Sequence, residues 1–411
     1  MRVVLATWGS RGDVEPLAGL AARLLAKGVD AVVCAPPDDE FVALLARAGA
    51  QLVPLGPTVQ SIVKRSPPPT AEDAFALARQ LVAARFETLP MVAADGCDAI
   101  VAAGLMPAGV RDVAEQLDVP YVLACFHILG LPSQGFAPGH RPGTPSPPGE
   151  TDKRVLWRQD AQRVNDLYRA PLNSLRATIG LPPVENVRDH VLTDRPWLAA
   201  DVLLCPSAGL TDLEVIQTGS WVLPDDRPLP DTLERFLRAG EPPVYIGFGS
   251  MATRPVQDAA RAAIQASRAH GRRVLIASGW AGLTASDVHQ DGLVIGEVNQ
   301  QALFARVSVV IHHGGAGTTS TAAHAGVPQV VVPLIADQPY WAGRVTALGI
   351  GAAVAGPVPA AGSLEGALAI ALAPETAARA REIAAAIPTD GASIAADLLI
   401  KRIKARRAGH V

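Results

Sequence analysis

The sequence predicts an α/β protein built from two doubly wound parallel sheets. Three observations lead to this prediction. Short apolar runs alternate with helix-patterned segments, the alternation occurs twice along the chain, and a proline-rich segment separates the two series. With 411 residues, and at roughly 100 to 200 residues per domain, the chain is long enough for two domains that each bury a core.

The first series begins at the N-terminus. An apolar run at 3–6 precedes a turn-rich segment from Thr7 to Asp13, and a helix is expected from about Pro16 to Lys27. Further strands of this series are expected at 31–35, 51–55, 99–103 and 121–125. Short apolar strands that alternate with helices are typical of parallel sheets.

The second series follows a segment from Leu223 to Pro230 that is rich in proline and charge and indicates a linker. Its strands are expected at 244–248, 273–277, 293–295, 308–311 and 329–332. The expected organisation is an N-terminal domain at 1–216, a linker at 217–242, a C-terminal domain at 243–390 and a C-terminal helix within 391–411.

Two segments interrupt the alternation. Ser66–Thr70 and Leu131–Gly149 are rich in proline, so both are expected to be irregular loops. Long loops of α/β proteins often shape a binding site, and plain surface is the alternative.

Composition excludes several classes of protein. The net charge is -3 and only 4% of residues are aromatic, which disfavours a polyanion-binding surface and a base-stacking platform. The four cysteines lie far apart and are expected to be reduced. The first residues suit a strand better than a signal peptide, and no apolar run reaches bilayer length. We expect a cytoplasmic monomer without nucleic-acid or membrane partners.

The segment 394–407 ends in a run of basic residues, which we interpret as the solvated end of a helix. Contact with a membrane or with RNA is the alternative.

A glycine-rich turn follows the expected strand at 308–311. It reads His312-His313-Gly314-Gly315-Ala316-Gly317-Thr318-Thr319, and a helix is expected to start near Thr318. Glycines let backbone N–H groups approach an anion and the helix N-terminus adds positive charge, so a diphosphate would fit here. A histidine and a threonine hydroxyl can add hydrogen bonds. Alternatively, the glycines only form a tight turn and Thr318 only caps the helix.

Two further loops follow the first strand of each half. Gly9–Gly12 and Gly247–Ala252 both miss the GxGxxG spacing, and the chain has no GxxxxGK[ST] motif, which weakens kinase and dehydrogenase interpretations. Open α/β sheets bind ligands at the carboxyl ends of their strands. Ser10 and Ser250 are therefore candidate phosphate or sugar contacts.

Three polar residues are candidates for contact with the reacting groups. Asp13 can serve as a general base if it faces a ligand, and a helix N-cap is the alternative. Asp337 and Gln338 follow the expected strand at 329–332 and suit sugar hydroxyls. A turn or capping role is the alternative for Asp337.

Taken in chain order, these segments resemble the GT-B family of nucleotide-sugar glycosyltransferases, and in particular the actinobacterial enzymes that act on vancomycin- and teicoplanin-type glycopeptides. The resemblance spans essentially the whole chain. The matching runs are GSRGDVEPL at 9–17, IGLPPVE at 179–185, VYIGFGS at 244–250, GEVN at 296–299, HHGGAGTT at 312–319 and ADQPY at 336–340.

The resemblance implies two Rossmann-like domains facing across a cleft, with the last helix crossing back to the first domain. It implies that the first domain binds the acceptor and the second the donor. Asp13 looks like the base. The implied donor residues are Ser10, Ser250, His313, Gly314, Gly315, Gly317 and Thr318 for the diphosphate, Asp337 and Gln338 for the sugar, and Trp280 and Val298 for the nucleobase.

The acceptor region is less well matched, because residues 126–152 align with no family pattern. His127 and Gln134 are candidate acceptor contacts there, with a structural role as the alternative for His127.

The function implied by the resemblance is an inverting O-glycosyltransferase. It would move a hexose from a UDP- or TDP-sugar to a hydroxyl of a glycopeptide aglycone. We find no DxD pair at a plausible site, so no metal and no cofactor besides the donor are expected. The alternatives are a glycosyltransferase for another natural-product aglycone, a nucleotide-sugar epimerase or hydrolase, and a silent sugar-nucleotide-binding protein.

Overall fold

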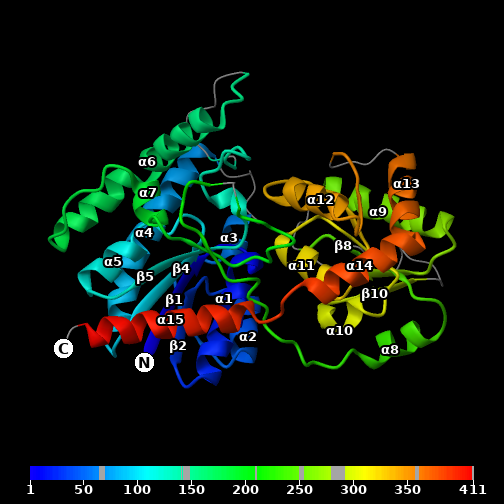
Figure 1. Cartoon of the computed structure of the whole chain (residues 1–411), viewed down its shortest axis with the longest axis horizontal. Coiled ribbons are helices and arrows are strands. Elements are labelled where there is room, and N and C mark those ends of the chain that lie inside the picture. The colour runs from blue at the N-terminus through cyan, green and yellow to red at the C-terminus, as the bar shows by residue number, and fades with distance from the viewer. Residues whose placement is uncertain are drawn as a thin grey trace. The chain divides into compact units, whose positions relative to one another are not determined.

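The computed structural model describes residues 1–63, 70–139, 141, 149–208, 211–249, 254–278, 292–356 and 361–409. The chain forms two compact units, one made of residues 1–223 with 389–411 and the other of residues 224–388 (Figure 1). Each unit contains one parallel sheet with helices around it. The predicted α/β fold with two doubly wound sheets is therefore confirmed.

The first sheet has the strand order β3-β2-β1-β4-β5-β6-β7, and every described pairing is parallel. Its strands are β1 (Arg2–Trp8), β2 (Asp30–Ala35), β3 (Gln51–Pro54), β4 (Ala99–Gly104), β5 (Tyr121–Cys125), β6 (Trp197–Leu198) and β7 (Ile216–Gln217). β1 is an inner strand between β2 and β4, and its apolar run from Val3 to Ala6 is fully buried. Because the strands are parallel, their carboxyl ends meet at one edge of the sheet.

The first unit carries helices between and after its strands. They are α1 (Arg11–Ala26), α2 (Asp39–Arg47), α3 (Val59–Val63), α4 (Ala71–Ala93), α5 (Val110–Gln116), η1 (Ile128–Gly130), α6 (Lys153–Thr178), α7 (Val187–Leu192) and α15 (Gly391–Ala408). α15 packs against α1, as Figure 1 shows in red and blue. By length and composition the described stretch 374–408 could cross a membrane, but its α15 part buries Ala395, Leu399 and Ile403 in the first core.

The second sheet has the order β10-β9-β8-β11-β12-β13. Its strands are β8 (Val244–Gly247), β9 (Val274–Ala277), β10 (Gly292–Ile295), β11 (Val309–His312), β12 (Gln329–Val331) and β13 (Gly351–Ala353). The helices of the second unit are α8 (Asp231–Arg238), α9 (Arg254–Ala269), α10 (Gln300–Phe304), α11 (Ala316–His324), α12 (Gln338–Ala347), α13 (Ala361–Leu372) and α14 (Pro374–Ala386). Val309 and Ile311 enter the core on one face and Val310 the core on the other. Helices thus cover both faces, as continuous apolar strands require.

The expected linker at 217–242 is divided between the units. Trp221 lies in the first core, where its ring packs edge-on against Trp197 at a centroid distance of 6.4 Å. Leu233 and Leu237 of α8 lie in a core of the second unit. The proline-rich stretch therefore joins two segments that each belong to a folded unit.

Candidate functional site

Asp13 lies in the first turn of α1, directly after β1. The helix starts at Arg11 with Ser10 as its N-cap, so Asp13 is neither the loop residue nor the N-cap that its position in the sequence suggested. Asp13 Oδ2 accepts hydrogen bonds from Ser10 N at 2.8 Å and from Ser10 Oγ at 3.3 Å. The helix dipole favours a negative charge in this turn. The carboxylate is thereby held in one place at the carboxyl edge of the first sheet.

Glycine makes room for this carboxylate. An added Cβ on Gly9 would lie 2.1 Å from Asp13 Oδ2 and 2.6 Å from its Cγ. Gly104, which pairs with Trp8 across the sheet, has a φ of +81°, and an added Cβ there would lie 2.5 Å from Thr7 Oγ1. A side chain at Gly9 would therefore displace the Asp13 carboxylate, and one at Gly104 would crowd Thr7 at the end of β1.

The two candidate acceptor contacts lie further along the same unit. His127 is half-buried and precedes η1. Gln134 is exposed, and its Nε2 donates to Asp212 Oδ1 at 3.1 Å. The nearby chain is tied to α6, since Trp157 Nε1 donates to Phe136 O at 2.9 Å. Contact of His127 and Gln134 with an acceptor stays a prediction. Residues 66–69, 140 and 142–148 of the expected irregular loops lie outside the described residues.

In the second unit, the glycine-rich turn leads from β11 into α11. The helix begins at Ala316 with Gly315 as its N-cap, so Thr318 does not cap it. Its first internal hydrogen bond runs from Thr319 N to Gly315 O at 3.0 Å. The N–H groups of residues 316–318 therefore have no acceptor inside the helix. Such groups, together with the helix dipole, form an anion-binding position.

The glycines of this turn differ in what they pack against. Gly314 has a φ of +90°, and an added Cβ would lie 2.7 Å from Val331 Cγ1. An added Cβ on Gly315 would lie 2.6 Å from His313 Nε2. Gly317 is exposed, with nothing within 4 Å of an added Cβ. Packing thus explains the first two glycines, whereas a side chain at Gly317 would point into open space beside the first turn of α11.

His313 is the polar side chain next to this N-terminus. Burial lowers its pKa, while the charge of Asp337 and a hydrogen bond with the Gly247 backbone act in the opposite direction, and the pKa stays below its ordinary value. Nδ1 is buried and has no hydrogen-bond partner in the part of the chain that the structure describes. Because the protein itself covers this atom, contact of His313 with a diphosphate oxygen stays a prediction.

His312 has a different role. It is fully buried, and burial, followed by the charge of His313, lowers its pKa to about 3. Its Nε2 lies 2.9 Å from Gln329 Oε1, and its Nδ1 accepts the Gly314 N–H at 3.1 Å. These bonds require a neutral ring with the proton on Nε2. His312 therefore supports the turn from inside.

Asp337 and Gln338 both make bonds within their own turn. Asp337 is the N-cap of α12, and its Oδ2 accepts from Trp341 Nε1 at 2.7 Å. Gln338 Oε1 accepts from Leu334 N at 2.7 Å and from Ile335 N at 2.9 Å. The Gln338 oxygen is thus engaged, and a sugar hydroxyl would have to use the amide N–H groups. Sugar contact by both residues stays a prediction.

Ala336, between these bonds, has a φ of +56°. This conformation is uncommon for a residue with a Cβ, and such strain often accompanies functional turns. The sequence offers no signal for it, because neither Gly nor Asn marks the position.

The remaining candidates for the donor give less information. Thr318 is half-buried in the first turn of α11, whereas the Thr319 hydroxyl donates to Gly315 O at 2.9 Å and so is engaged within the helix. Val298 follows β10 and packs against a core of the second unit. Ser250 and Trp280 lie outside the described residues.

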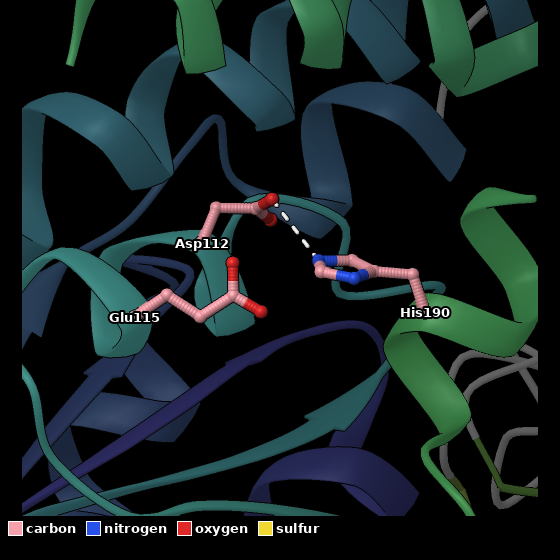
Figure 2. Close-up of side chains that lie close together, drawn as sticks. All are labelled: Asp112, Glu115 and His190. Atoms are coloured by element: carbon pink, nitrogen blue, oxygen red, sulfur yellow. Dashed lines mark hydrogen bonds and ion pairs between the residues drawn. The ribbon is translucent and has the colours of Figure 1, made fainter. Parts of the chain in front are cut away.

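A cluster of metal-type side chains occurs in the first unit, away from these turns. Asp112 and Glu115 of α5 lie close to His190 of α7, and Figure 2 shows Asp112 hydrogen-bonded to the histidine ring. Arg176 Nη1 bonds to Asp112 Oδ1 and lies 3.0 Å from Glu115 Oε2. The guanidinium therefore already supplies the positive charge that a metal would bring. We interpret the cluster as an ion-pair network that joins α5, α6 and α7.

Comparison with known proteins identifies the family. The chain is 52% identical to glycosyltransferase GtfE of Amycolatopsis orientalis, with 98% of both chains covered. It is 49% identical to the vancomycin aglycone glucosyltransferase of the same organism, again over 98% of both chains. The chain belongs to this family of glycosyltransferases. The glycosyltransferase is also 46% identical to the dTDP-epi-vancosaminyltransferase of A. orientalis over 93% of both chains. Residues 285–397 match the family described as erythromycin biosynthesis protein CIII-like, C-terminal domain.

Solved structures confirm the fold of the glycosyltransferase. The glycotransferase of kitacinnamycin superposes with a TM-score of 0.71 at 18% identity, with 98% of this chain and 99% of that chain covered. The calicheamicin glycosyltransferase CalG4 gives a TM-score of 0.68 at 19% identity over 98% of both chains. The predicted GT-B fold is therefore confirmed, and the relatives at 49% and 52% identity confirm the predicted transferase class.

Proposed function

We propose that this glycosyltransferase is an inverting O-glycosyltransferase that moves a hexose from a UDP- or TDP-sugar to a hydroxyl of a vancomycin- or teicoplanin-type aglycone. The single observation that carries the proposal is the 49% identity, over nearly the whole chain, to a vancomycin aglycone glucosyltransferase. The relative named for a dTDP-sugar supports TDP as the donor nucleotide.

Asp13 is the proposed general base. It would accept the proton of the acceptor hydroxyl while the acceptor oxygen attacks the anomeric carbon and the bond to the diphosphate oxygen breaks. Attack from the side opposite the leaving group inverts the configuration at that carbon. A phenol has a pKa of about 10, so a carboxylate suffices if the proton moves late. The hydrogen bonds from Ser10 N and Oγ support this role, because they fix the carboxylate before the acceptor binds.

The turn before α11 is the proposed site for the leaving diphosphate. The N–H groups of residues 316–318 and the His313 ring can donate hydrogen bonds to its oxygens as negative charge develops. Fixed donors of this kind are worth about 10²- to 10³-fold in rate each. Transfer without a divalent metal is part of the proposal, as is action by a monomer in the cytoplasm.

The direct test is a mass-spectrometric screen of UDP-glucose and TDP-glucose against the vancomycin and teicoplanin aglycones, with and without EDTA. The proposal expects an aglycone heavier by one hexose, with inverted anomeric configuration and a yield unaffected by EDTA. Hydrolysis or epimerisation of the donor without a glycosylated product would favour the alternative reactions instead.

A further inference from the structure

Arg85 is a buried cation in the middle of α4. It is 1% exposed, and its guanidinium donates to three main-chain carbonyls of one loop. Nη1 lies 3.0 Å from Met106 O and 3.0 Å from Ala108 O, and Nη2 lies 3.1 Å from Leu105 O. Among the described residues no carboxylate pairs with it. Burial lowers its pKa to about 10, while Tyr168 and Tyr121 act in the opposite direction, so the group is charged at neutral pH.

The loop that Arg85 holds is bonded to the end of β1, the strand that leads into the Asp13 turn. Residues 105–108 follow β4, which pairs with β1 so that Gly104 stands opposite Trp8. Leu105 N donates to Trp8 O at 2.9 Å, and Gly9 and Ser10 come next along the chain. The Leu105 backbone is therefore bonded to the end of the strand that leads into the Asp13 turn.

The side chain of Leu105 is exposed to solvent. It is 40% exposed, although the neighbouring strand residues are buried. A buried charge without a counter-charge is costly, and removing it would leave carbonyl groups without donors. The arrangement is therefore suited to holding the backbone of 105–108, and with it the direction of Leu105, in one conformation.

We propose that Leu105 is an acceptor-contact residue, an apolar surface for the ring that carries the attacking hydroxyl, and that Arg85 is the positioning residue that holds it next to the end of β1, the strand that leads into the Asp13 turn. This inference rests on the proposed function and adds a determinant of acceptor specificity to it. Loop residues on a rigid sheet commonly carry such specificity.

The first test is Leu105→Ala, measured with vancomycin aglycone and whichever of UDP-glucose and TDP-glucose is the better donor. Losing part of a leucine contact should raise the acceptor KM about tenfold, with kcat and the donor KM changed less than about twofold. Val42→Ala is the matched control, since Val42 is a 46% exposed residue of α2. An unchanged acceptor KM in Leu105→Ala would overturn the contact.

The second test separates positioning from general stability. Arg85→Lys keeps the charge, but the compact ammonium lacks the planar fork by which two guanidinium nitrogens bond to the carbonyls of the loop. The variant should raise the acceptor KM about fivefold, and the effect should disappear in the Leu105→Ala background, because both changes remove the same contact. Equal effects in both backgrounds would overturn the positioning role.

Failure of the proposed function would be seen separately, as a wild-type enzyme that glycosylates no aglycone. Whether Arg85 holds the backbone of residues 105–108 is then tested by hydrogen exchange in the full-length protein. The amides of residues 105, 106 and 108–110 should exchange about tenfold faster in Arg85→Lys while the β1 amides are unchanged. Equal exchange in the two proteins would overturn it.

Discussion

The Asp13 carboxylate occupies the space beside Gly9 that a side chain would fill. Its Oδ2 would lie 2.1 Å from an added Cβ on Gly9, while the same oxygen accepts a hydrogen bond from Ser10 N at 2.8 Å. The position of the carboxylate is therefore set from two sides by the short turn between β1 and α1.

Gly9→Ala should displace the carboxylate without removing it. A shift of about 1 Å at a reacting group can cost about 10²-fold in rate, so kcat should fall by that order while nucleoside diphosphate binding is kept. Gly12→Ala is the matched control, because an added Cβ there would lie at an ordinary 3.6 Å from Ser10 Oγ. Steady-state kinetics check the pair, and equal kcat values would contradict the assigned role of Gly9.

Binding of nucleoside diphosphate should depend on pH through His313. Its pKa is lowered in the free protein, chiefly by burial, and a bound diphosphate would raise it. Affinity should therefore rise as pH falls from the pKa of the complex toward that of the free protein, with uptake of a proton. Calorimetry with UDP and TDP at pH 6 to 8, in buffers of different ionisation enthalpy, measures this uptake, and His313→Gln supplies the baseline. The same uptake in both proteins would contradict it.

Gly317 should favour binding of the nucleoside diphosphate at a cost in helix stability. An exposed glycine inside a helix costs up to about 1 kcal/mol relative to alanine. Gly317→Ala should therefore keep or raise the Tm, yet weaken nucleoside diphosphate binding about tenfold, because a Cβ would enter the open space beside the first turn of α11. Gly366→Ala in α13, also exposed with open space around it, should change stability only. Unaltered binding by Gly317→Ala would contradict a ligand at this position.

Ten of the thirteen described strands were predictable, because buried parallel strands are continuous apolar runs, whereas β6, β7 and β13, which are only two or three residues long, were missed. The run at 121–125 coincides with β5, and the run at 273–277 contains β9. The start of α1 was missed because Gly12 and Asp13 resemble a loop. Yet Ser10 and Asp13, three residues apart, carry half of a capping-box signal.

Other features of the site could not be predicted from the sequence. An arginine in a helix is ordinarily solvent-exposed, and only the tertiary structure brings the carbonyls of 105–108 to Arg85. Likewise, the sequence does not distinguish the structural His312 from the partly satisfied His313. Their difference depends on Gln329, which comes from the next strand.

The ion-pair network around Asp112 should contribute to stability at neutral pH. Burial would raise the pKa of Asp112, but His190 and Arg176 lower it further than burial raises it. Its contribution is therefore present above the unfolded-state pKa of about 4 and is lost as pH falls through the lower folded-state pKa. Asp112→Asn should lower the free energy of unfolding by about 3 to 5 kcal/mol at pH 7, measured by urea unfolding. The variant should also lose less stability than wild type as the pH falls.

The control for this network is Asp95→Asn, which removes an exposed pair with Arg2 and should cost less than about 1 kcal/mol. Equal losses of unfolding free energy in the two variants would show that the buried network stabilises the protein no more than the exposed pair does.

The most direct measurement of the central claim compares wild type with Asp13→Asn in two assays on the same preparations. One is glycosylation of vancomycin aglycone by mass spectrometry, and the other is calorimetric binding of UDP and TDP. The account predicts that Asp13→Asn binds the nucleoside diphosphate as wild type does and loses most of the transfer, as Asp13→Ala should too. Turnover at the wild-type rate in both variants would contradict it, because the carboxylate would then take no part in activating the acceptor.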